Sequence, residues 1–135
     1  MAFLVSDVMV TIPKTHPAGA TVDEIRSLFE DDRVRLALIV DADGRLVTTI
    51  EREDLLAGDG PVAELGTLEG RTVGPSAPLA SATRVLLRAR KRRLAVVDDA
   101  GRLVGLLGLR RDALGFCSDE SIRARAPRPR FRSAA

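Results

Sequence analysis

The sequence predicts an α+β protein built from two copies of one unit. Two apolar, β-rich runs joined by an Asp/Gly turn occur at 36–50, and nearly the same pattern occurs again at 94–107. From Val22 to Glu51 the first copy aligns with the second without a gap at an offset of 57 residues, and Gly-Arg-Leu-Val is identical in both. A duplication that keeps helix, strands and turn in phase is typical of a tandem repeat.

The length and composition agree with this interpretation. The chain has 135 residues, enough for one domain or for two small subdomains that depend on each other. Hydrophobic residues make up 45%, but tryptophan and tyrosine are absent and there are four phenylalanines, so we expect a core of Val, Leu, Ile and Ala. The scarcity of aromatic side chains also argues against stacking as the means of holding a base or a sugar.

The first unit begins with a short helix and an extended segment. The residues of 5–9 that share one helical face are Val5, Val8 and Met9. The two prolines of 11–20 favour an extended segment with a loop. Thr21 and Glu24 then form the pattern of a capping box, in which each side chain accepts the backbone N–H of the other. We therefore expect the first long helix to begin here.

The rest of the first unit reads as a helix, a hairpin and a short closing helix. The apolar face of the long helix consists of Val22, Ile25, Leu28 and Phe29. The continuous apolar run at 36–40 predicts a strand that is buried on both faces, and 46–50 predicts its hairpin partner. Residues 51–57 predict a closing helix that ends at Gly58.

The second unit repeats this order. Residues 61–65 match the short helix, and Pro78 stands at a helix start, where its missing N–H costs nothing. The apolar face of the second long helix falls on the aligned positions, which are Leu79, Ala82, Val85 and Leu86. We place the first repeat at 1–58, the second at 59–117, and a short C-terminal turn or helix with an Arg-rich flexible tail at 118–135.

This order of elements, with the signature VVD-x-x-G-R-L-V-G at 96–105, resembles the CBS domain, and two such domains in tandem resemble a Bateman module. The resemblance covers about residues 5–116. It implies two β-α-β-β-α repeats with pseudo-two-fold symmetry whose sheets pack face to face. It also implies no catalysis: such pairs commonly bind adenine nucleotides or related adenosyl ligands between the repeats, regulate other domains, and form homodimers.

The ligand motif of the family, Gly-h-h-Thr/Ser-x-x-Asp after the second strand, is incomplete in both repeats. In the first, Asp54 stands at the position of the ribose acceptor, but Glu51 replaces the hydroxyl that meets phosphate. In the second, Gly108 replaces the hydroxyl and Arg111 replaces the acid. A carboxylate at Glu51 repels phosphate and suits a neutral or cationic adenosyl compound better than a triphosphate. The resemblance implies an adenine nucleotide or S-adenosylmethionine as the ligand.

The extended segments supply the remaining candidate residues, because in the family they border the adenine with backbone groups. The ligand-binding residues that the resemblance implies here are Thr15, His16, Glu51, Asp54, Thr72 and Val73. His16 is the only histidine and has no cluster of cysteines to join, so we predict no metal site. We also predict no enzyme, because the sequence contains no supported catalytic triad and no phosphate-binding loop motif.

The positive charge is concentrated in two segments. The chain has 21 Lys and Arg against 19 Asp and Glu, but residues 123–135 hold five arginines and no acid, so the body has 16 basic residues against 19 acidic ones. We therefore limit nucleic-acid binding to non-specific contacts of the tail. Within the body, 88–93 is basic where the aligned 30–32 is acidic. Complementary ends of this kind suit a head-to-tail homodimer.

The location and role follow from the remaining features. Cys117 is the only cysteine, which excludes an intramolecular disulfide. The N-terminus lacks the basic segment of a signal peptide, and no apolar run approaches the roughly 18 residues of a membrane helix. We expect a cytoplasmic, stand-alone CBS pair that senses an adenosyl ligand. The alternative is a dimerising adaptor with degenerate ligand sites, which acts on partner proteins or nucleic acid through its Arg-rich tail.

Overall fold

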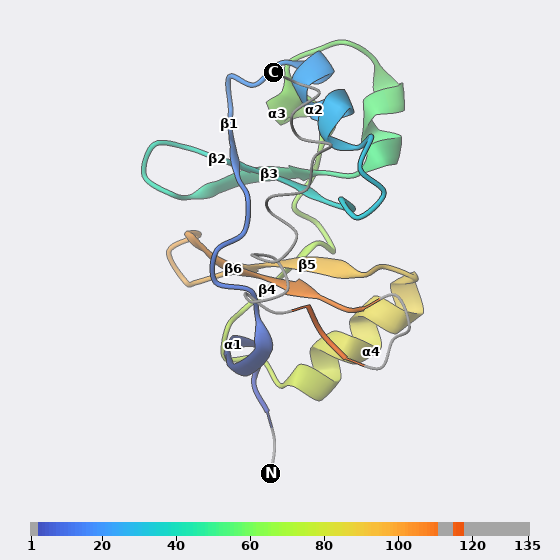
Figure 1. Ribbon diagram of the computed structural model, residues 1–135. Coiled ribbons are helices and arrows are strands. Elements are labelled where there is room, and N and C mark those ends of the chain that lie inside the picture. The colour runs from blue at the N-terminus through green and yellow to red at the C-terminus, as the bar shows by residue number, and fades with distance from the viewer. Residues whose placement is uncertain (1–2, 111–114, 118–135) are drawn as a thin grey trace.

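The computed structural model describes residues 3–110 and 115–117 of the chain. In this part, two three-stranded sheets lie one above the other, and helices cover their outer faces (Figure 1). The strand orders are β1-β2-β3 and β4-β5-β6, and in each sheet the first pair is parallel and the hairpin antiparallel. This confirms the predicted α+β architecture of two related halves with their sheets face to face.

The elements follow the predicted order in both halves. The first repeat contains α1 (Val5–Val8), β1 (His16–Pro17), α2 (Val22–Leu28), β2 (Ala37–Val40), β3 (Leu46–Ile50) and the 3-10 helix η1 (Arg52–Ala57). The second contains α3 (Val62–Leu65), β4 (Thr72–Val73), α4 (Leu79–Ala89), β5 (Arg93–Val97) and β6 (Leu103–Gly108). The turn or helix and the Arg-rich tail that we predicted at 118–135 lie outside the described residues.

Local sequence accounts for the start of α2 and for both hairpin turns. The Thr21 N–H donates to Glu24 Oε1 at 2.8 Å and the Glu24 N–H donates to Thr21 Oγ1 at 3.1 Å, which confirms the capping box. In the first turn, Asp41 Oδ1 accepts two backbone N–H groups. Gly44 of this turn has a φ of 84°, a conformation that strains residues with a Cβ. The turn at 98–101 repeats both features.

The two central strands are buried on both faces, as the apolar run at 36–40 predicted for the first of them. In β2, Ala37 and Ile39 belong to the same core as Ile25 of α2, whereas Leu38 belongs to the layer between the sheets. The residues of β5 alternate in the same way between the core under α4 and the central layer. Alternation along each strand therefore supplies two outer cores and one shared layer.

The burial of α4 differs from the prediction at one position. Ala82 and Leu86 are buried as expected and Leu79 is partly buried, but Val85 is 50% exposed. With 3.6 residues per turn, Val85 lies roughly 100° around the helix from Leu86, on the flank of the buried stripe. The contact of α4 with its sheet is too narrow to cover this flank.

The first helix of each repeat packs into the core of the other repeat. Val5 of α1 lies in one core cluster with Leu86 and Leu107 of the second repeat, and it is fully buried. Val62 of α3 lies in the corresponding cluster with Ile25 of the first repeat. The boundary between 58 and 59 therefore stays a proposal about the sequence repeats, because each structural half contains segments of both.

Backbone hydrogen bonds extend this exchange into the sheets. The Val10 N–H donates to the Leu106 carbonyl at 2.8 Å, and Leu106 returns the bond to Val10 at 2.9 Å, so the segment after α1 pairs with β6. The segment after α3 pairs with β3, where the Thr67 N–H donates to the Thr49 carbonyl at 3.1 Å. Each segment then crosses to the sheet of its own repeat.

Gly66 provides a test of this exchange, because it follows α3 at its contact with β3. A Cβ on Gly66 would clash with the carbonyl oxygen of Thr49 and the side chain of Ile50. We expect Gly66→Ala to lower the free energy of unfolding in urea by about 1–3 kcal/mol, since backbone cannot move aside cheaply. Gly60→Ala is the control: a Cβ there meets nothing within 4 Å, and its effect should stay within about 0.5 kcal/mol. Equal stability of the two variants would contradict the exchange.

Candidate ligand site between the repeats

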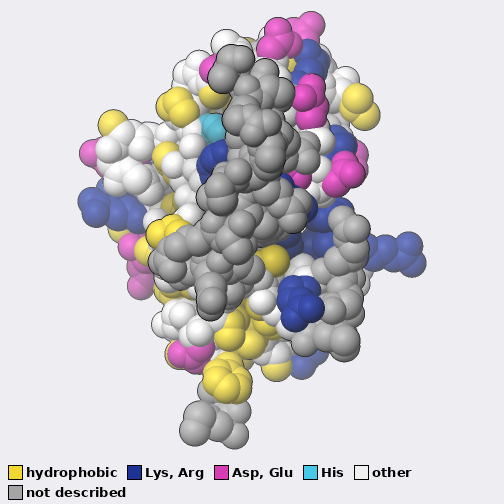
Figure 2. Space-filling view, in the orientation of Figure 1, with side chains coloured by type: hydrophobic (Ala, Val, Ile, Leu, Met, Phe, Trp, Pro, Cys, Tyr) yellow, Lys and Arg dark blue, Asp and Glu magenta, His cyan; other side chains and the backbone are white. Residues whose placement is uncertain are grey.

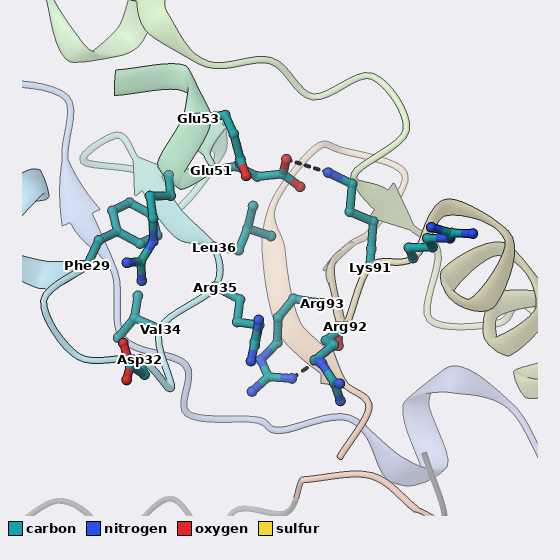
Figure 3. Close-up of a pocket in the computed structure, with 12 residues that line it drawn as sticks. Phe29, Asp32, Val34, Arg35, Leu36, Glu51, Glu53, Lys91, Arg92 and Arg93 are labelled. Carbon is teal, nitrogen blue, oxygen red and sulfur yellow. Dashed lines mark hydrogen bonds and ion pairs between the residues drawn. The ribbon is translucent and has the colours of Figure 1, made fainter. Parts of the chain in front are cut away.

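A cavity of about 380 Å³ lies where the two repeats meet. Three segments that are distant in sequence form its walls: 34–36 before β2, 51–53 after β3, and 90–93 around the start of β5 (Figure 3). Phe29 and Asp32 complete the lining. Because the first repeat supplies two walls and the second repeat the third, a ligand here contacts both.

Positive charge predominates in the lining. The cationic residues are Arg35, Arg52, Arg90, Lys91, Arg92 and Arg93, and the acidic ones are Asp32, Glu51 and Glu53. In the space-filling view, dark blue Lys and Arg side chains gather on the right between the upper and lower halves (Figure 2). A concave surface with such a surplus of cations favours anionic ligands over cationic ones.

An ion-pair network joins Glu51 and Asp54 to the second repeat. Arg71, which precedes β4, donates from Nη1 to Asp54 Oδ2 at 2.6 Å and from Nη2 to Glu51 Oε1 at 3.2 Å. Lys91 Nζ donates to the same Glu51 oxygen at 2.5 Å. The side chains of Arg71, Glu51 and Asp54 are only 14%, 13% and 19% exposed. Water and salt therefore screen these pairs less than pairs on the surface.

Asp54 also caps η1, because its Oδ2 accepts the backbone N–H of Glu51 at 2.8 Å. Partial burial acts to raise the pKa of Asp54, but hydrogen bonds from Arg71 and from the Glu51 N–H, with the charge of Arg71, hold that pKa below its ordinary value. The second contact of Arg71, to Oδ1, measures 3.3 Å. Among the described residues these bonds use three of the roughly four acceptor positions of the carboxylate. One acceptor position on Oδ1 has no partner among the described residues.

Four of the six predicted ligand residues lie on one side of the structure. Thr72 and Val73 form β4 and directly follow Arg71, the residue that binds Asp54 and Glu51. Of the six, only Glu51 lines the cavity. The structure thus brings the acidic end of the first repeat next to the first strand of the second.

The other two predicted residues lie at the opposite edge of the first sheet. His16 belongs to β1, which β2 separates from β3, and Thr15 precedes it. Burial, with a smaller contribution from the charge of Lys14, lowers the pKa of His16 below its ordinary value. Gly108 ends β6, and Arg111 lies outside the described residues.

The cationic lining was not predicted from the sequence. From the sequence, the basic 88–93 and the acidic 30–32 suit a head-to-tail dimer, which stays a prediction. Within one chain, Asp32 and 90–93 line the same cavity. The repeat alignment contained a signal for this. Residues 34–36 and 91–93 occupy equivalent positions at the start of the two central strands, and positions related by a two-fold axis meet where they lie close to that axis.

Comparison with known proteins places this geometry in a family. The chain matches the CBS domain over residues 5–58 and again over 63–111. It therefore belongs to the CBS domain family and carries two tandem copies, as the sequence signature indicated.

In the described residues no three His, Cys, Asp or Glu side chains gather as metal ligands would, and no helix there has the length and apolarity to cross a bilayer.

Similar proteins include one enzyme and two solved structures. The chain is 28% identical over 102 residues to inosine-5'-monophosphate dehydrogenase of Nitrosopumilus maritimus (strain SCM1), a match that covers 74% of this chain and only 21% of that protein. It is similar to CBSX2 in complex with AMP, with 25% identity, a TM-score of 0.69, and 98% and 99% of the two chains covered. It is also similar to CBS domain protein PAE2072 from Pyrobaculum aerophilum complexed with AMP, with 26% identity, a TM-score of 0.65, and 83% and 95% covered.

Removal of Arg71 tests the ion-pair network. We expect Arg71→Ala to lower the free energy of unfolding at pH 7 by about 2–4 kcal/mol, because it leaves two partly buried carboxylates with fewer partners. Arg26→Ala is the control, since Arg26 pairs with the exposed carboxylates of Asp23 and Asp59. Its loss should be below about 1 kcal/mol. Urea denaturation measures both, and equal losses would show that the network contributes no more than surface pairs do.

Proposed function

We propose that this CBS pair is a regulatory module that senses an adenine nucleotide in the cavity between its repeats. The carrying observation is the cavity, whose walls come from both repeats and whose charged lining is mostly cationic. A ligand that contacts both walls favours one relative position of the repeats, and this population shift is how binding becomes a signal. The two AMP-bound structures similar to this chain support the choice of nucleotide.

Specific residues receive roles in this proposal. Asp54 does not itself line the cavity. In the proposal it accepts a ribose hydroxyl from a nucleoside that extends past Glu51 toward β4, while Arg71 keeps its own contacts. Thr72 and Val73 of β4 border the adenine of this ligand. Thr15 and His16 lie at the opposite edge of the first sheet and are assigned to a second, separate adenine position. The support for Thr72 and Val73 is that they follow directly after Arg71, which holds Asp54.

The charges in the cavity favour a nucleotide over S-adenosylmethionine. From the sequence alone, Glu51 favours a neutral or cationic ligand because its carboxylate repels phosphate. In the structure, however, Lys91 and Arg71 both donate to Glu51 and compensate its charge. The remaining lining residues carry more positive than negative charge.

The proposed role is binding and regulation without catalysis, in the cytoplasm. The chain spans about a fifth of the dehydrogenase that it matches, so that enzyme's activity is no guide to the role of this chain. The adaptor alternative, in which the ligand sites have decayed, gains no support from the family match or from the AMP-bound neighbours.

Ligand binding is tested by denaturation in the presence of AMP, ATP, adenosine and S-adenosylmethionine. We expect AMP at one hundred times its dissociation constant to raise the free energy of unfolding by about 2.7 kcal/mol, because it binds only the folded chain. The same rise should occur in a chain that ends at Cys117, since the lining residues found in the described part of the chain all precede Cys117. The proposal fails if none of the four compounds shifts the transition. Tighter binding of the sulfonium compound than of AMP would refute the charge argument.

We also propose a homodimer. Val85 and Leu87 on α4 are 50% and 56% exposed and lie on the two flanks of the buried stripe, roughly 200° apart, so each flank leaves apolar area that a second chain can cover. We expect sedimentation velocity to show a dimer at tens of micromolar, and Leu87→Asp to shift it toward monomer, since a carboxylate is costly to bury. A monomer of the unmodified protein at this concentration would contradict the proposal.

A further inference from the structure

Glu51 has an unusual position for an acidic residue, at the wall of a cavity lined mainly by cations. We propose that Glu51 is an internal anion that takes the place of a ligand phosphate, so that a phosphate-bearing ligand must compete with it for Lys91. This inference rests on the proposed function and deepens it. It makes Glu51 the residue that determines how much the phosphate group adds to the affinity of the nucleoside.

The contacts of Glu51 are those that a phosphate oxygen makes. Its Oε1 accepts from an ammonium, Lys91 Nζ at 2.5 Å, and from a guanidinium, Arg71 Nη2 at 3.2 Å. Both donors belong to the second repeat, whereas Glu51 belongs to the first. Carboxylate and phosphate oxygens are the usual partners of these two cations. The carboxylate is 13% exposed, so these bonds form away from bulk water.

The two cations differ in how readily they can change partner. Arg71 also binds Asp54 at 2.6 Å and the Thr49 carbonyl at 3.2 Å, so it keeps its place when the contact with Glu51 is lost. Lys91 is 42% exposed, and its ammonium sits on a flexible four-carbon stem. Figure 3 shows Lys91 extended toward Glu51 from the opposite wall of the cavity. Lys91 is therefore the cation that exchanges, and Arg71 the one that stays.

Competition of this kind acts on the phosphate only. A nucleoside without phosphate does not need Lys91 and leaves the contact with Glu51 intact. The phosphate of AMP pairs with Lys91 only after the bond between Lys91 and Glu51 has broken. Breaking that bond offsets part of the binding energy of the phosphate. The remaining cations of the lining, Arg35 and 92–93 among them, still attract an anion into the cavity.

The first test is Glu51→Gln, which keeps the size of the side chain and removes its charge. By isothermal titration calorimetry we expect AMP to bind this variant about tenfold tighter than the unmodified protein. The reason is that Lys91 no longer has a charge-assisted bond to Glu51 that the phosphate must replace. Adenosine should bind within about twofold of its original affinity. Glu64→Gln is the matched control: Glu64 is exposed on α3 and is not among the residues that line the cavity, so both ligands should change by less than about twofold.

A double-mutant cycle with Lys91→Met separates competition from simple repulsion of phosphate by Glu51. If Lys91 exchanges between Glu51 and the ligand, Lys91→Met weakens AMP binding more in the Glu51→Gln background than in the unmodified one. If Glu51 only repels phosphate and Lys91 screens it, the loss is larger in the unmodified background. The second sign of coupling would overturn the inference. Thermal denaturation of each variant checks that it is folded.

The failure of this inference is distinguishable from failure of the proposed function. If AMP and adenosine bind and Glu51→Gln changes neither, the site stands and the competition is refuted. If neither compound binds any of the variants, the proposed function fails and the inference fails with it. A gain for AMP and adenosine alike would also refute it, because competition for Lys91 concerns the phosphate alone.

Discussion

The exchange of short helices between the two repeats is the constraint on which the rest of the structure depends. Val5 and Val62 are each buried in the core of the other repeat. A repeat of fewer than sixty residues buries a small share of its surface and is only marginally stable by itself, and the exchange makes each half complete only with its counterpart. It also holds the two sheets at a fixed separation, filled by a thin apolar layer that includes Leu38 and Ala95.

The cavity is a consequence of this arrangement. The equivalent segments at the start of β2 and β5, residues 34–36 and 91–93, both line it. The side chains there have diverged: Val34 and Leu36 of the first repeat correspond to Lys91 and Arg93 of the second. The backbones of the two repeats are alike, but their side chains differ in charge. The second repeat therefore supplies only cations to the charged lining, whereas the first supplies Glu51. Such a site depends on the relative position of the repeats, which is what a sensing module requires.

The ion-pair network shows why charge must be judged in three dimensions. In the sequence, Glu51 is an acidic residue at the motif position that meets phosphate. In the structure, Lys91 and Arg71 donate to its carboxylate and compensate the negative charge. Its partners lie 20 and 40 residues away along the chain. Coulomb energy depends on separation in space, and a sequence lists neighbours only along the chain. Alignment with a motif therefore allowed Asp54 and Glu51 to be proposed as site residues, whereas it gave no signal for their contacts with Arg71.

The sequence by itself determined the features that depend on near neighbours and on periodicity. The capping box at Thr21, the Asp/Gly turns, and the burial of β2 on both faces were all predictable, because the interactions span a few residues or follow from alternation. The repeat signature likewise indicated the family. Only the tertiary structure decided which core receives Val5, that Val85 stays half-exposed, and which cations compensate Glu51. These outcomes depend on the distances between segments that packing, rather than local sequence, brings together.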